Sequence, residues 1–485
     1  MFLITDILRK TFARRMRDID RFKTHPAEVQ REMLRRRLIA GSGTLFGREF
    51  GIGDAWSPEQ FAARVPTFDY ERFKPYVERM LRGESDVTSP GRVRSFAQSS
   101  GTTSERSKYI PVTRRSVWQN HTQGMRDVVT LYEAAWPRSG LLEGKTLTLG
   151  GSCRMEGPNL VGDLSAVLLK RTAPWNGLTC VPRGNTALQP DFDRKCEAIC
   201  RTCAKEDVRA FAGVPSWNLE LMRRMLEYTG RKNLREVWPR LECFIYGGVA
   251  FAPYRDTFME LIPGDDMHYM ETYNASEGFF AIADDPVRDD MLLMLDYGTY
   301  YEFRRGEEIV PLEGVREGET YALLITSDNG LWRYEIGDTV TITSTKPYRI
   351  RFAGRTRQFI NVFGEELIVD NAERALTEAC RRTGARVEEY TVAPCFMTLE
   401  HRGAHEWVVE FVREPASREQ FAEVLDEALR RENSDYDAKR RTTLERLHLH
   451  PVERGRFLRW MRTRGKNKVP RMANDRRVAE EIVQM

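Results

Sequence analysis

Short apolar runs typical of β-strands alternate with amphipathic helical stretches along most of this chain. The runs at 146–149, 243–246 and 321–325 lie between segments in which apolar residues recur every three or four positions. This alternation predicts an α/β fold with mixed sheets flanked by helices. The predicted helices cover residues 1–40, 57–64, 70–82, 115–135, 192–205 and 217–228. At 485 residues, the chain exceeds one ordinary core and predicts more than one domain.

Two glycine-marked turns suggest where the chain divides. Gly354 and Gly364 bracket a short apolar run. We therefore expect a large domain at 1–354 and a small α+β domain at 355–485. In the small domain, the pattern predicts helices at 371–382 and 417–430, and strands at 389–392, 396–399 and 407–411.

Charge and hydropathy bear on two classes of function. The 75 Lys and Arg residues against 71 Asp and Glu leave a net charge of +4, which does not require a nucleic-acid partner. No apolar run approaches the roughly 18 residues of a membrane span, and the N-terminus lacks the pattern of a secretory leader. A basic amphipathic helix at 1–40 could lie on a membrane, but packing against the protein's own core is favoured. We expect a cytoplasmic protein without membrane association.

Three cysteines raise the question of a metal site. Cys196, Cys200 and Cys203 share helical spacing with Phe192 and Ile199, and no Cys or His pair follows at zinc-finger spacing. The spacing favours a buried helix face over metal ligands.

The basic C-terminal segment also has two interpretations. Residues 439–477 contain 14 Lys or Arg and 3 Asp or Glu, a surplus that a nucleic-acid-binding face would show. A small domain that closes over ATP and pyrophosphate would also benefit from this charge, and we favour that interpretation. Phe457 and Trp460 lie at helical spacing and are expected to anchor a helix.

The densest chemical signal is a loop of small hydroxyl residues around Gly101. It follows the β-like run 93–97 and precedes Lys108, a possible counter-charge. Its hydroxyl and amide groups could surround phosphate oxygens, although such loops are also ordinary turns. A Walker A motif is excluded because no Gly-Lys-Ser/Thr closes the loop.

Two later segments carry complementary chemistry. Tyr273, Ser276 and Glu277 combine an aromatic ring, a hydroxyl and a carboxylate that could reach phosphate through Mg²⁺. Asp338 follows Gly337, where its oxygens could accept hydrogen bonds from ribose hydroxyls or cap a turn.

Taken together and in this order, the three segments resemble the auxin-responsive (Gretchen Hagen type) acyl-acid amido synthetase family. This family belongs to the adenylate-forming superfamily of acyl-CoA synthetases, nonribosomal adenylation domains and luciferase. Further family-like segments lie at 44–52, 65–84, 214–217, 246–249, 433–436 and 466–471, so the resemblance covers nearly the whole chain.

The resemblance implies a role for each matching residue. It assigns the ATP phosphates to Ser99, Ser100, Thr102, Thr103 and Ser104. It places Tyr273 against adenine, Ser276 at the α-phosphate and Glu277 toward Mg²⁺. It gives Asp338 and Arg355 to the ribose, and Gly247, Gly248 and Val249 to the adenine and acyl wall. Lys468 resembles a late lysine of a mobile C-terminal lid. Glu105 departs from the glycine usual in the family, and its carboxylate would repel phosphate unless it faces solvent or pairs with Arg106.

The implied activity is that of an acid–amine ligase. A small carboxylic acid reacts with MgATP to give an acyl adenylate and pyrophosphate, and an amine, expected to be an amino acid, then takes the acyl group. An acyl-CoA ligase that uses the same adenylate is the alternative within this superfamily. A basic nucleic-acid-binding protein is the alternative of another class, and it would leave the three motifs without a purpose.

Overall fold

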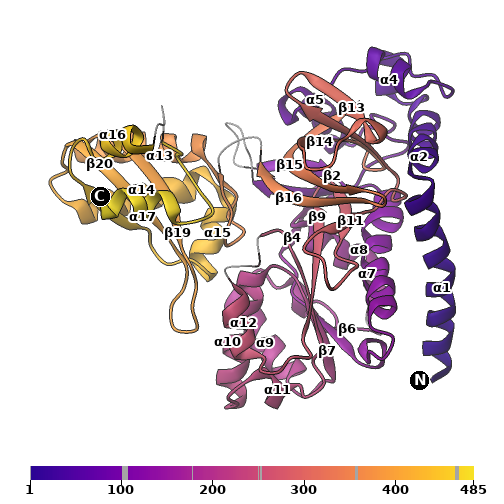
Figure 1. Ribbon diagram of the computed structural model, residues 1–485, viewed down its shortest axis with the longest axis horizontal. Coiled ribbons are helices and arrows are strands. Elements are labelled where there is room, and N and C mark those ends of the chain that lie inside the picture. The colour runs from indigo at the N-terminus through magenta and orange to yellow at the C-terminus, as the bar shows by residue number, and fades with distance from the viewer. Residues whose placement is uncertain are drawn as a thin grey trace.

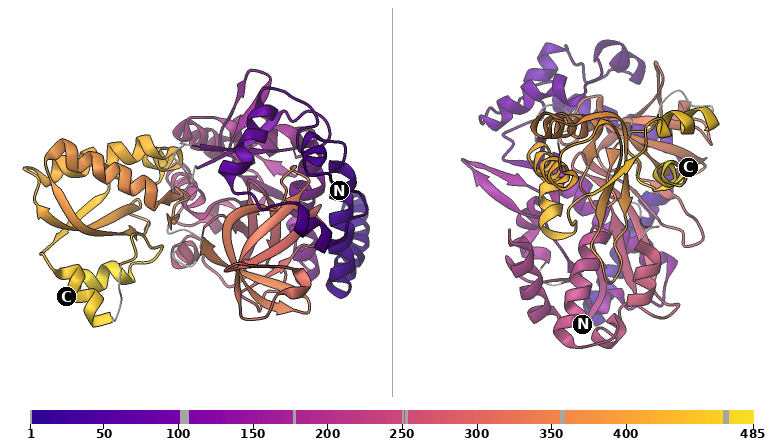
Figure 2. Two further views of the ribbon diagram at one scale, coloured as in Figure 1. Left: turned by 90° about the horizontal axis from the view of Figure 1, so that it is seen from above. Right: turned by 90° about the vertical axis from the view of Figure 1, so that its left-hand side faces the viewer.

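The computed structural model describes residues 2–100, 107–176, 179–249, 251, 254–355, 359–464 and 469–485. The elements gather into a larger lobe and a smaller C-terminal lobe beside it (Figures 1 and 2). The larger lobe contains mixed sheets flanked by helices. This arrangement confirms the predicted α/β class.

Helices of the larger lobe occupy both the N-terminal region and the connections between strands. They are α1 (Phe2–Thr24), α2 (Pro26–Gly41), α3 (Leu45–Glu49), α4 (Pro58–Arg64), α5 (Tyr70–Leu81), α6 (Arg114–Ser116), the π-helix η1 (Val117–His121), α7 (Thr122–Ala135), α8 (Leu164–Asn176), α9 (Phe192–Cys203), α10 (Pro215–Thr229), α11 (Leu234–Val237) and α12 (Arg255–Leu261). Short 3₁₀ turns lie at η2 (Leu141–Glu143), η3 (Thr186–Leu188) and η5 (Leu312–Gly314). Local signals mark several ends: Ser57 and Gln60 form a capping box at α4, and α10 begins at Pro215.

Within the described residues, the largest sheet has twelve strands. Their order is β13 (Glu308–Pro311), β12 (Thr299–Arg305), β14 (Thr320–Ser327), β15 (Tyr334–Thr345), β16 (Tyr348–Arg355), β11 (Met291–Leu293), β10 (Gly278–Ile282), β9 (His268–Ala275), β8 (Cys243–Gly247), β7 (Val208–Ala212), β3 (Lys145–Thr148) and β6 (Cys180–Val181). Pairing is parallel from β6 to β9 and antiparallel from β9 to β13.

A second sheet of four strands carries the entrance to the hydroxyl-rich loop. Its order is β2 (Ser107–Pro111), β1 (Ser95–Ser100), β5 (Asn159–Gly162) and β4 (Cys153–Glu156). Strand β1 pairs parallel with β5 and antiparallel with β2. The loop therefore connects the adjacent ends of two paired strands.

The C-terminal lobe is α+β, with two small sheets among the described residues. One pairs β17 (Phe359–Ile360) with β18 (Leu367–Ile368), and the other has the order β19 (Arg386–Cys395), β20 (Ala404–Arg413), β21 (His448–Val452). The helices are α13 (Val369–Thr383), α14 (Arg418–Glu432), α15 (Ser434–Thr442), α16 (Arg456–Arg464) and α17 (Arg477–Gln484).

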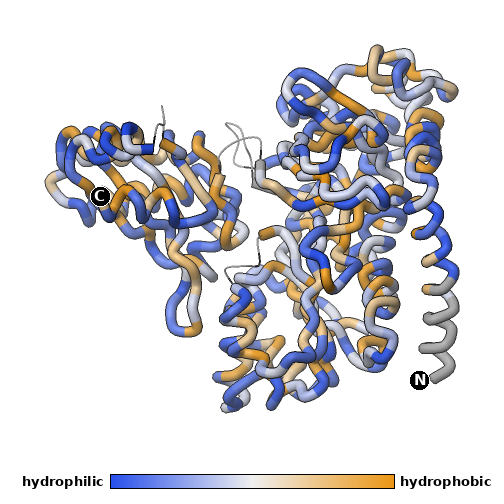
Figure 3. Tube along the Cα trace, in the orientation of Figure 1, coloured by the Kyte–Doolittle hydropathy of each residue, from blue (hydrophilic) through white to orange (hydrophobic). Residues whose placement is uncertain are grey.

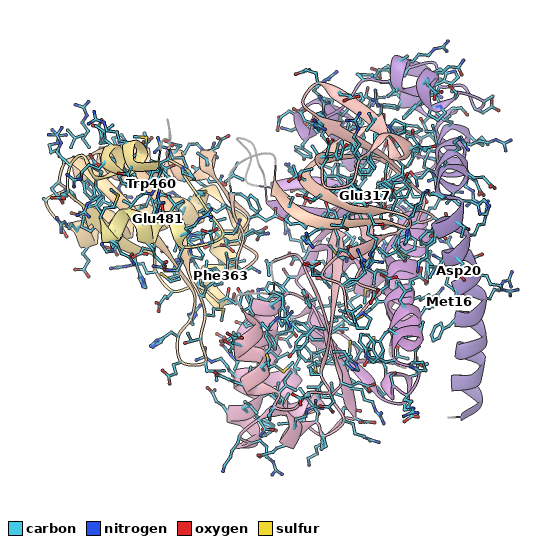
Figure 4. All side chains as sticks on the ribbon, viewed as in Figure 1. Met16, Asp20, Glu317, Phe363, Trp460 and Glu481 are labelled. Carbon is cyan, nitrogen blue, oxygen red and sulfur yellow. The ribbon has the colours of Figure 1, made fainter. Side chains whose placement is uncertain are left out.

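Buried polar contacts join the two lobes. Tyr254 donates its hydroxyl to the Val362 carbonyl at 2.6 Å, and the Ser216 hydroxyl lies 3.0 Å from the Phe363 carbonyl. Figure 4 shows Phe363 at the edge of the C-terminal lobe that faces the larger lobe. The ammonium of Lys439 on α15 lies 3.9 Å from the centre of the Trp217 ring on α10. The start of the C-terminal segment is therefore held by side chains of the larger lobe.

Two predicted elements are wrong in detail. The helix expected at 1–40 breaks between Thr24 and Pro26, because a proline lacks the N–H that a continuing helix would need. Residues 396–399, expected as a strand, follow the end of β19 at Cys395 and belong to a turn. Thr398 Oγ1 accepts hydrogen bonds from the backbone N–H of Glu400 and His401, which holds that turn.

Helix α1 lies on the outside of the larger lobe, and Figure 3 shows hydrophilic residues over much of its described length. Its inner face contributes Ile19 and Phe22 to the core. No described helix is long and apolar enough to cross a membrane. The helix is thus held by core packing, as its pattern predicted.

The cysteine cluster forms an apolar helix face. Cys196, Cys200 and Cys203 are buried on α9 with Phe192 and Ile199, and burial raises the pKa of the Cys196 thiol to about 12. No cluster of three or more metal-ligating side chains occurs among the described residues. The helical interpretation is confirmed.

The aromatic residues of the basic segment are also internal. Phe457 and Trp460 are buried on α16, and the Trp460 indole donates to Glu481 at 2.8 Å (Figure 4). Both rings anchor the helix, so neither can stack on a nucleic-acid base in this structure.

A buried ion pair fixes the start of β15. Arg333 has a positive φ of 41° and donates to both carboxylate oxygens of Glu302, at 2.8 to 3.1 Å. Its guanidinium also donates to the carbonyls of Ala62 and Val65 at 2.8 and 2.7 Å. These bonds join β12, the end of α4 and the strand that carries Asp338.

We predict that Arg333→Met lowers the free energy of unfolding by about 3–5 kcal/mol, because Glu302 would remain buried without its cation. Urea denaturation measures this loss. Arg418→Met is the matched control, since Arg418 and Glu414 are 57% and 51% exposed and such pairs contribute at most about 1 kcal/mol. Equal losses in the two variants would contradict an anchoring role for Arg333.

Candidate active site

Strand register places the hydroxyl-rich loop beside a buried lysine. Ser99 lies opposite Lys108, and Ser100 opposite Ser107, where β1 and β2 approach the loop. The side chains of Ser99 and Ser100 lie outside the described part of the structure, as do residues 101–106, which include Thr102, Thr103 and Ser104. Lys108 itself is buried, with its ammonium 5.5 Å from the centre of the Tyr70 ring.

Glu277 lies in the tight turn between β9 and β10. Its side chain is buried, and burial raises its pKa to about 7, while the positive charge of Lys108 opposes this rise and Asp338 adds to it. The Asn329 amide donates to the Glu277 carbonyl at 3.0 Å. Ser276 precedes it in the same turn and is half-buried. The second motif thus presents a desolvated carboxylate to Lys108 and Asp338.

Tyr273 and Asp338 come from different strands and form a direct hydrogen bond. The Tyr273 hydroxyl donates to Asp338 Oδ2 at 2.7 Å, and both residues are buried. The Tyr273 ring packs edge-on against Phe280 and Phe352, with centroids 5.0 and 5.7 Å away. The structure therefore brings the second and third motifs together.

The register of β15 and β16 adds Arg355 to this group by its backbone position. Asp338 lies directly opposite Arg355 in the antiparallel ladder. The Arg355 side chain and residues 356–358 lie outside the described part, and so does Lys468. Beyond Lys468, Val469 is buried, and the Pro470 carbonyl accepts from Thr391 at 2.7 Å.

The residues expected to form the adenine and acyl wall lie one strand away from Tyr273. Gly247 ends β8 opposite Thr272, and a Cβ at Gly247 would lie 2.4 Å from the Thr272 carbonyl oxygen. Gly248 follows with a φ of +84°, which favours glycine, and its carbonyl accepts from Asn361 at 3.1 Å. Val249 is buried beside them.

Sequence reasoning missed a polar pair on the π-helix η1. Asn120 bonds to the backbone of Phe279, and His121 Nδ1 lies 3.2 Å from Asn274 Oδ1, so both reach the β9–β10 hairpin. His121 is fully buried, which lowers its pKa to about 4. Its Nε2 has no hydrogen-bond partner among the described residues. Asn120 and His121 lie within a polar stretch from Gln119 to Gln123, so the local sequence does not single out these two residues.

The chain matches the domains of one family along most of its length. The GH3 family N-terminal domain matches residues 15–159 and 160–267, the central domain 292–355 and the C-terminal domain 370–477. These matches include Asp338 and lie on either side of the Glu277 turn, which falls between residues 267 and 292.

Characterised relatives are distant but extend over most of the chain. Indole-3-acetic acid-amido synthetase GH3.8 of Oryza sativa subsp. indica is 24% identical over 464 residues, which cover 79% of this chain and 75% of the relative. The 4-substituted benzoates-glutamate ligase GH3.12 of Arabidopsis thaliana is 21% identical over 455 residues, covering 77% and 76%.

Solved structures share the fold at lower identity. The AtGH3.15 acyl acid amido synthetase, in complex with 2,4-DB, superimposes with a TM-score of 0.62 and 18% identity, over 98% of this chain and 95% of that one. A 2-hydroxyisobutyryl-CoA ligase with 2-HIB-AMP and CoA has a TM-score of 0.59 and 16% identity, over 96% and 94%. Because the family domains match well over half of its residues, the chain belongs to the GH3 family.

Proposed function

We propose that this GH3 protein is an ATP-dependent acyl-acid amido synthetase acting in the cytoplasm. It activates a carboxylic acid as an acyl adenylate and then forms an amide with an amine, most simply an amino acid. The convergence of Tyr273, Glu277 and Asp338 near Lys108 carries this proposal. The names of its relatives, which are amido synthetases and an acid–glutamate ligase, support it.

In this proposal the nucleotide lies across the three motifs. The loop residues Ser99, Ser100, Thr102, Thr103 and Ser104 bind phosphates, and Ser276 approaches the α-phosphate. Tyr273 lies against adenine, Asp338 and Arg355 bind ribose, and Gly247, Gly248 and Val249 form the adenine and acyl wall. The hydrogen bond between Tyr273 and Asp338 supports a shared adenosine site, because it holds both side chains in one place.

Glu277 fits a Mg²⁺ site of the kind that nucleotide enzymes use. Mg²⁺ prefers oxygen ligands, retains water and needs only one or two carboxylates when phosphates supply the remaining oxygens. The buried Glu277 provides such a carboxylate close to Lys108. The ion, when bound, would supply positive charge to the phosphates.

The chain itself contributes alignment and charge. The acid must meet the α-phosphorus in line with the leaving pyrophosphate, and no protein nucleophile is needed for this displacement. We propose that residues 1–354 hold ATP and the acid, while residues 355–485 form a lid. Movement of that lid would bring Lys468 to the phosphates for one half-reaction.

Carboxylate-dependent ATP–pyrophosphate exchange tests the first half-reaction, and mass spectrometry of products formed with amino acids tests the second. An amide product supports the proposal. A thioester formed with CoA instead would assign the chain to the acyl-CoA ligase alternative. Salt-sensitive RNA or DNA binding without any exchange would favour the nucleic-acid alternative.

We predict that Asp338→Ala raises the KM for ATP about 10- to 100-fold, as expected for loss of a hydrogen bond to a charged group worth about 1.5–3 kcal/mol. Exchange kinetics with varied ATP measure this change. Asp289→Ala is the control, because Asp289 is 84% exposed and its carboxylate pairs with a surface arginine, Arg351. An unchanged KM in a folded Asp338→Ala protein would remove this residue from the ribose site.

We predict that Glu277→Gln weakens Mg²⁺ dependence and changes the pH dependence of stability. Because burial raises the pKa of Glu277 from 4.5 to about 7, wild-type stability falls as pH rises from about 4.5 to about 7 and then levels off, since the unfolded chain releases this proton at lower pH than the folded chain. Glutamine does not ionise. Without Mg²⁺, urea denaturation should therefore show the variant gaining stability relative to wild type between about pH 4.5 and pH 7. Parallel pH profiles for the two proteins would contradict the ionisation of Glu277.

We predict that Lys468→Ala slows pyrophosphate exchange about 10²-fold or more, in line with loss of one electrostatic stabiliser. Amide formation from supplied acyl adenylate should stay within a few-fold of wild type, because the lysine serves adenylation. Lys466→Ala, two positions away, controls for loss of charge in this segment. Equal damage to both half-reactions would show that Lys468 supports the fold instead.

A further inference from the structure

A pocket lies at the end of β1 opposite the hydroxyl-rich loop. It has a volume of about 810 Å³ and opens between α2, the segment 88–95, the 112–119 segment and the turn at 327–330. Ser95, at the start of β1, lines it, whereas the hydroxyl-rich loop follows Ser100 at the other end of this strand. Five residues of strand separate the two ends by about 17 Å. The pocket is therefore distinct from the proposed phosphate site.

Positive charge dominates the lining of this pocket. Its lining includes one carboxylate, Asp328, and six arginines: Arg37, Arg92, Arg94, Arg114, Arg115 and Arg171. Arg94 and Arg114 are exposed at the rim, whereas Arg37 and Asp328 are buried and form an ion pair at the base. The formal excess of five positive charges far exceeds what Asp328 alone can balance.

Several buried polar atoms of the pocket lack a hydrogen-bond partner among the described residues. They are the donors Arg37 Nε, Ser89 Oγ and Ser327 Oγ, together with the two carboxylate oxygens of Asp328, which forms ion pairs with Arg37 and Arg115. Each belongs to a residue no more than 8% exposed. Buried donors without partners are costly and uncommon in native proteins, so they indicate a ligand that supplies acceptors. Burial and the charges of Arg115 and Arg36 lower the pKa of Arg37 to about 9, which an added anion would oppose.

The walls of the pocket are held in place by contacts of their own. Arg171 Nε donates to Ser95 Oγ at 2.8 Å, and Arg171 Nη2 donates to the Arg94 carbonyl at 3.2 Å. The Trp332 indole donates to the Thr88 carbonyl at 2.8 Å. Gly41 packs so closely on Trp332 that a Cβ would lie 2.2 Å from the ring. The arginines thus surround a preformed cavity.

We propose that this pocket binds a small organic anion that carries at least two carboxylate or phosphate groups. Guanidinium groups recognise both kinds of anion through paired N–H donors, and several of them around one cavity favour a multivalent ligand over a monovalent one. The hydroxyls of Ser89 and Ser327 add donors at the base.

Isothermal titration calorimetry with three probes tests the proposal. Citrate represents polycarboxylates, fructose 1,6-bisphosphate represents phosphates, and acetate is the monovalent control. We expect at least one polyanion to bind the wild-type protein about 10-fold or more tightly than acetate, with affinity falling as salt rises. The polyanion that binds distinguishes the two ligand chemistries.

Variants locate the binding site. Arg94→Gln combined with Arg114→Gln should weaken polyanion binding about 10-fold or more. Arg231→Gln removes one charge from an exposed position outside the pocket and should bind as wild type does. Asp338→Ala should also bind as wild type does, because it alters the proposed ribose site instead. Unchanged affinity in the Arg94/Arg114 variant, loss of binding in Asp338→Ala, or no polyanion binding at about 10 mM would each overturn the proposal.

Discussion

The candidate site depends on one change of strand direction within the twelve-stranded sheet. Strands β6 to β9 run parallel, and the chain then reverses through a tight turn into antiparallel β10. This turn contains Glu277, whose carbonyl is held by Asn329. The antiparallel half then brings β15 into the same sheet, so that Asp338 meets Tyr273 of β9. Residues distant in sequence converge because one sheet contains both pairing patterns.

The sequence identified the converging residues where they belong to short motifs, and it missed residues outside such motifs. The α/β class and the helical cysteines follow from local patterns, and the family resemblance assigned Tyr273 and Asp338 to one nucleotide, which agrees with their hydrogen bond. His121 was missed because its partner, Asn274, is 153 residues away, and helical periodicity gives no sign of a π-helix. The false strand at 396–399 was a short apolar run, for which periodicity cannot separate a strand from a turn with a few buried side chains.

The turn at Asp328 and Asn329 belongs to two neighbourhoods at once. Asn329 holds the Glu277 turn, while Asp328 pairs with Arg37 at the base of the arginine pocket. Thr113 also holds this turn, because its hydroxyl donates to the Asp328 carbonyl at 2.7 Å. A shift of this turn would therefore change the contacts of both the Glu277 carbonyl and Arg37.

The carbonyls of Val362 and Phe363 limit any rotation of the C-terminal lobe. Both lie after Gly354, yet both accept buried hydrogen bonds from Tyr254 and Ser216 of the larger lobe. Rotation about Gly354 would break these bonds, at a cost of about 1 kcal/mol each, unless water replaced them. Rotation about Gly364 would leave both intact, but it would separate β17 from β18 and break the hydrogen bonds that join Asn474 to Phe359 and Asn361. Residues 359–363 are therefore hydrogen-bonded to both lobes, and a rotation about either glycine has to break bonds on one side of this segment.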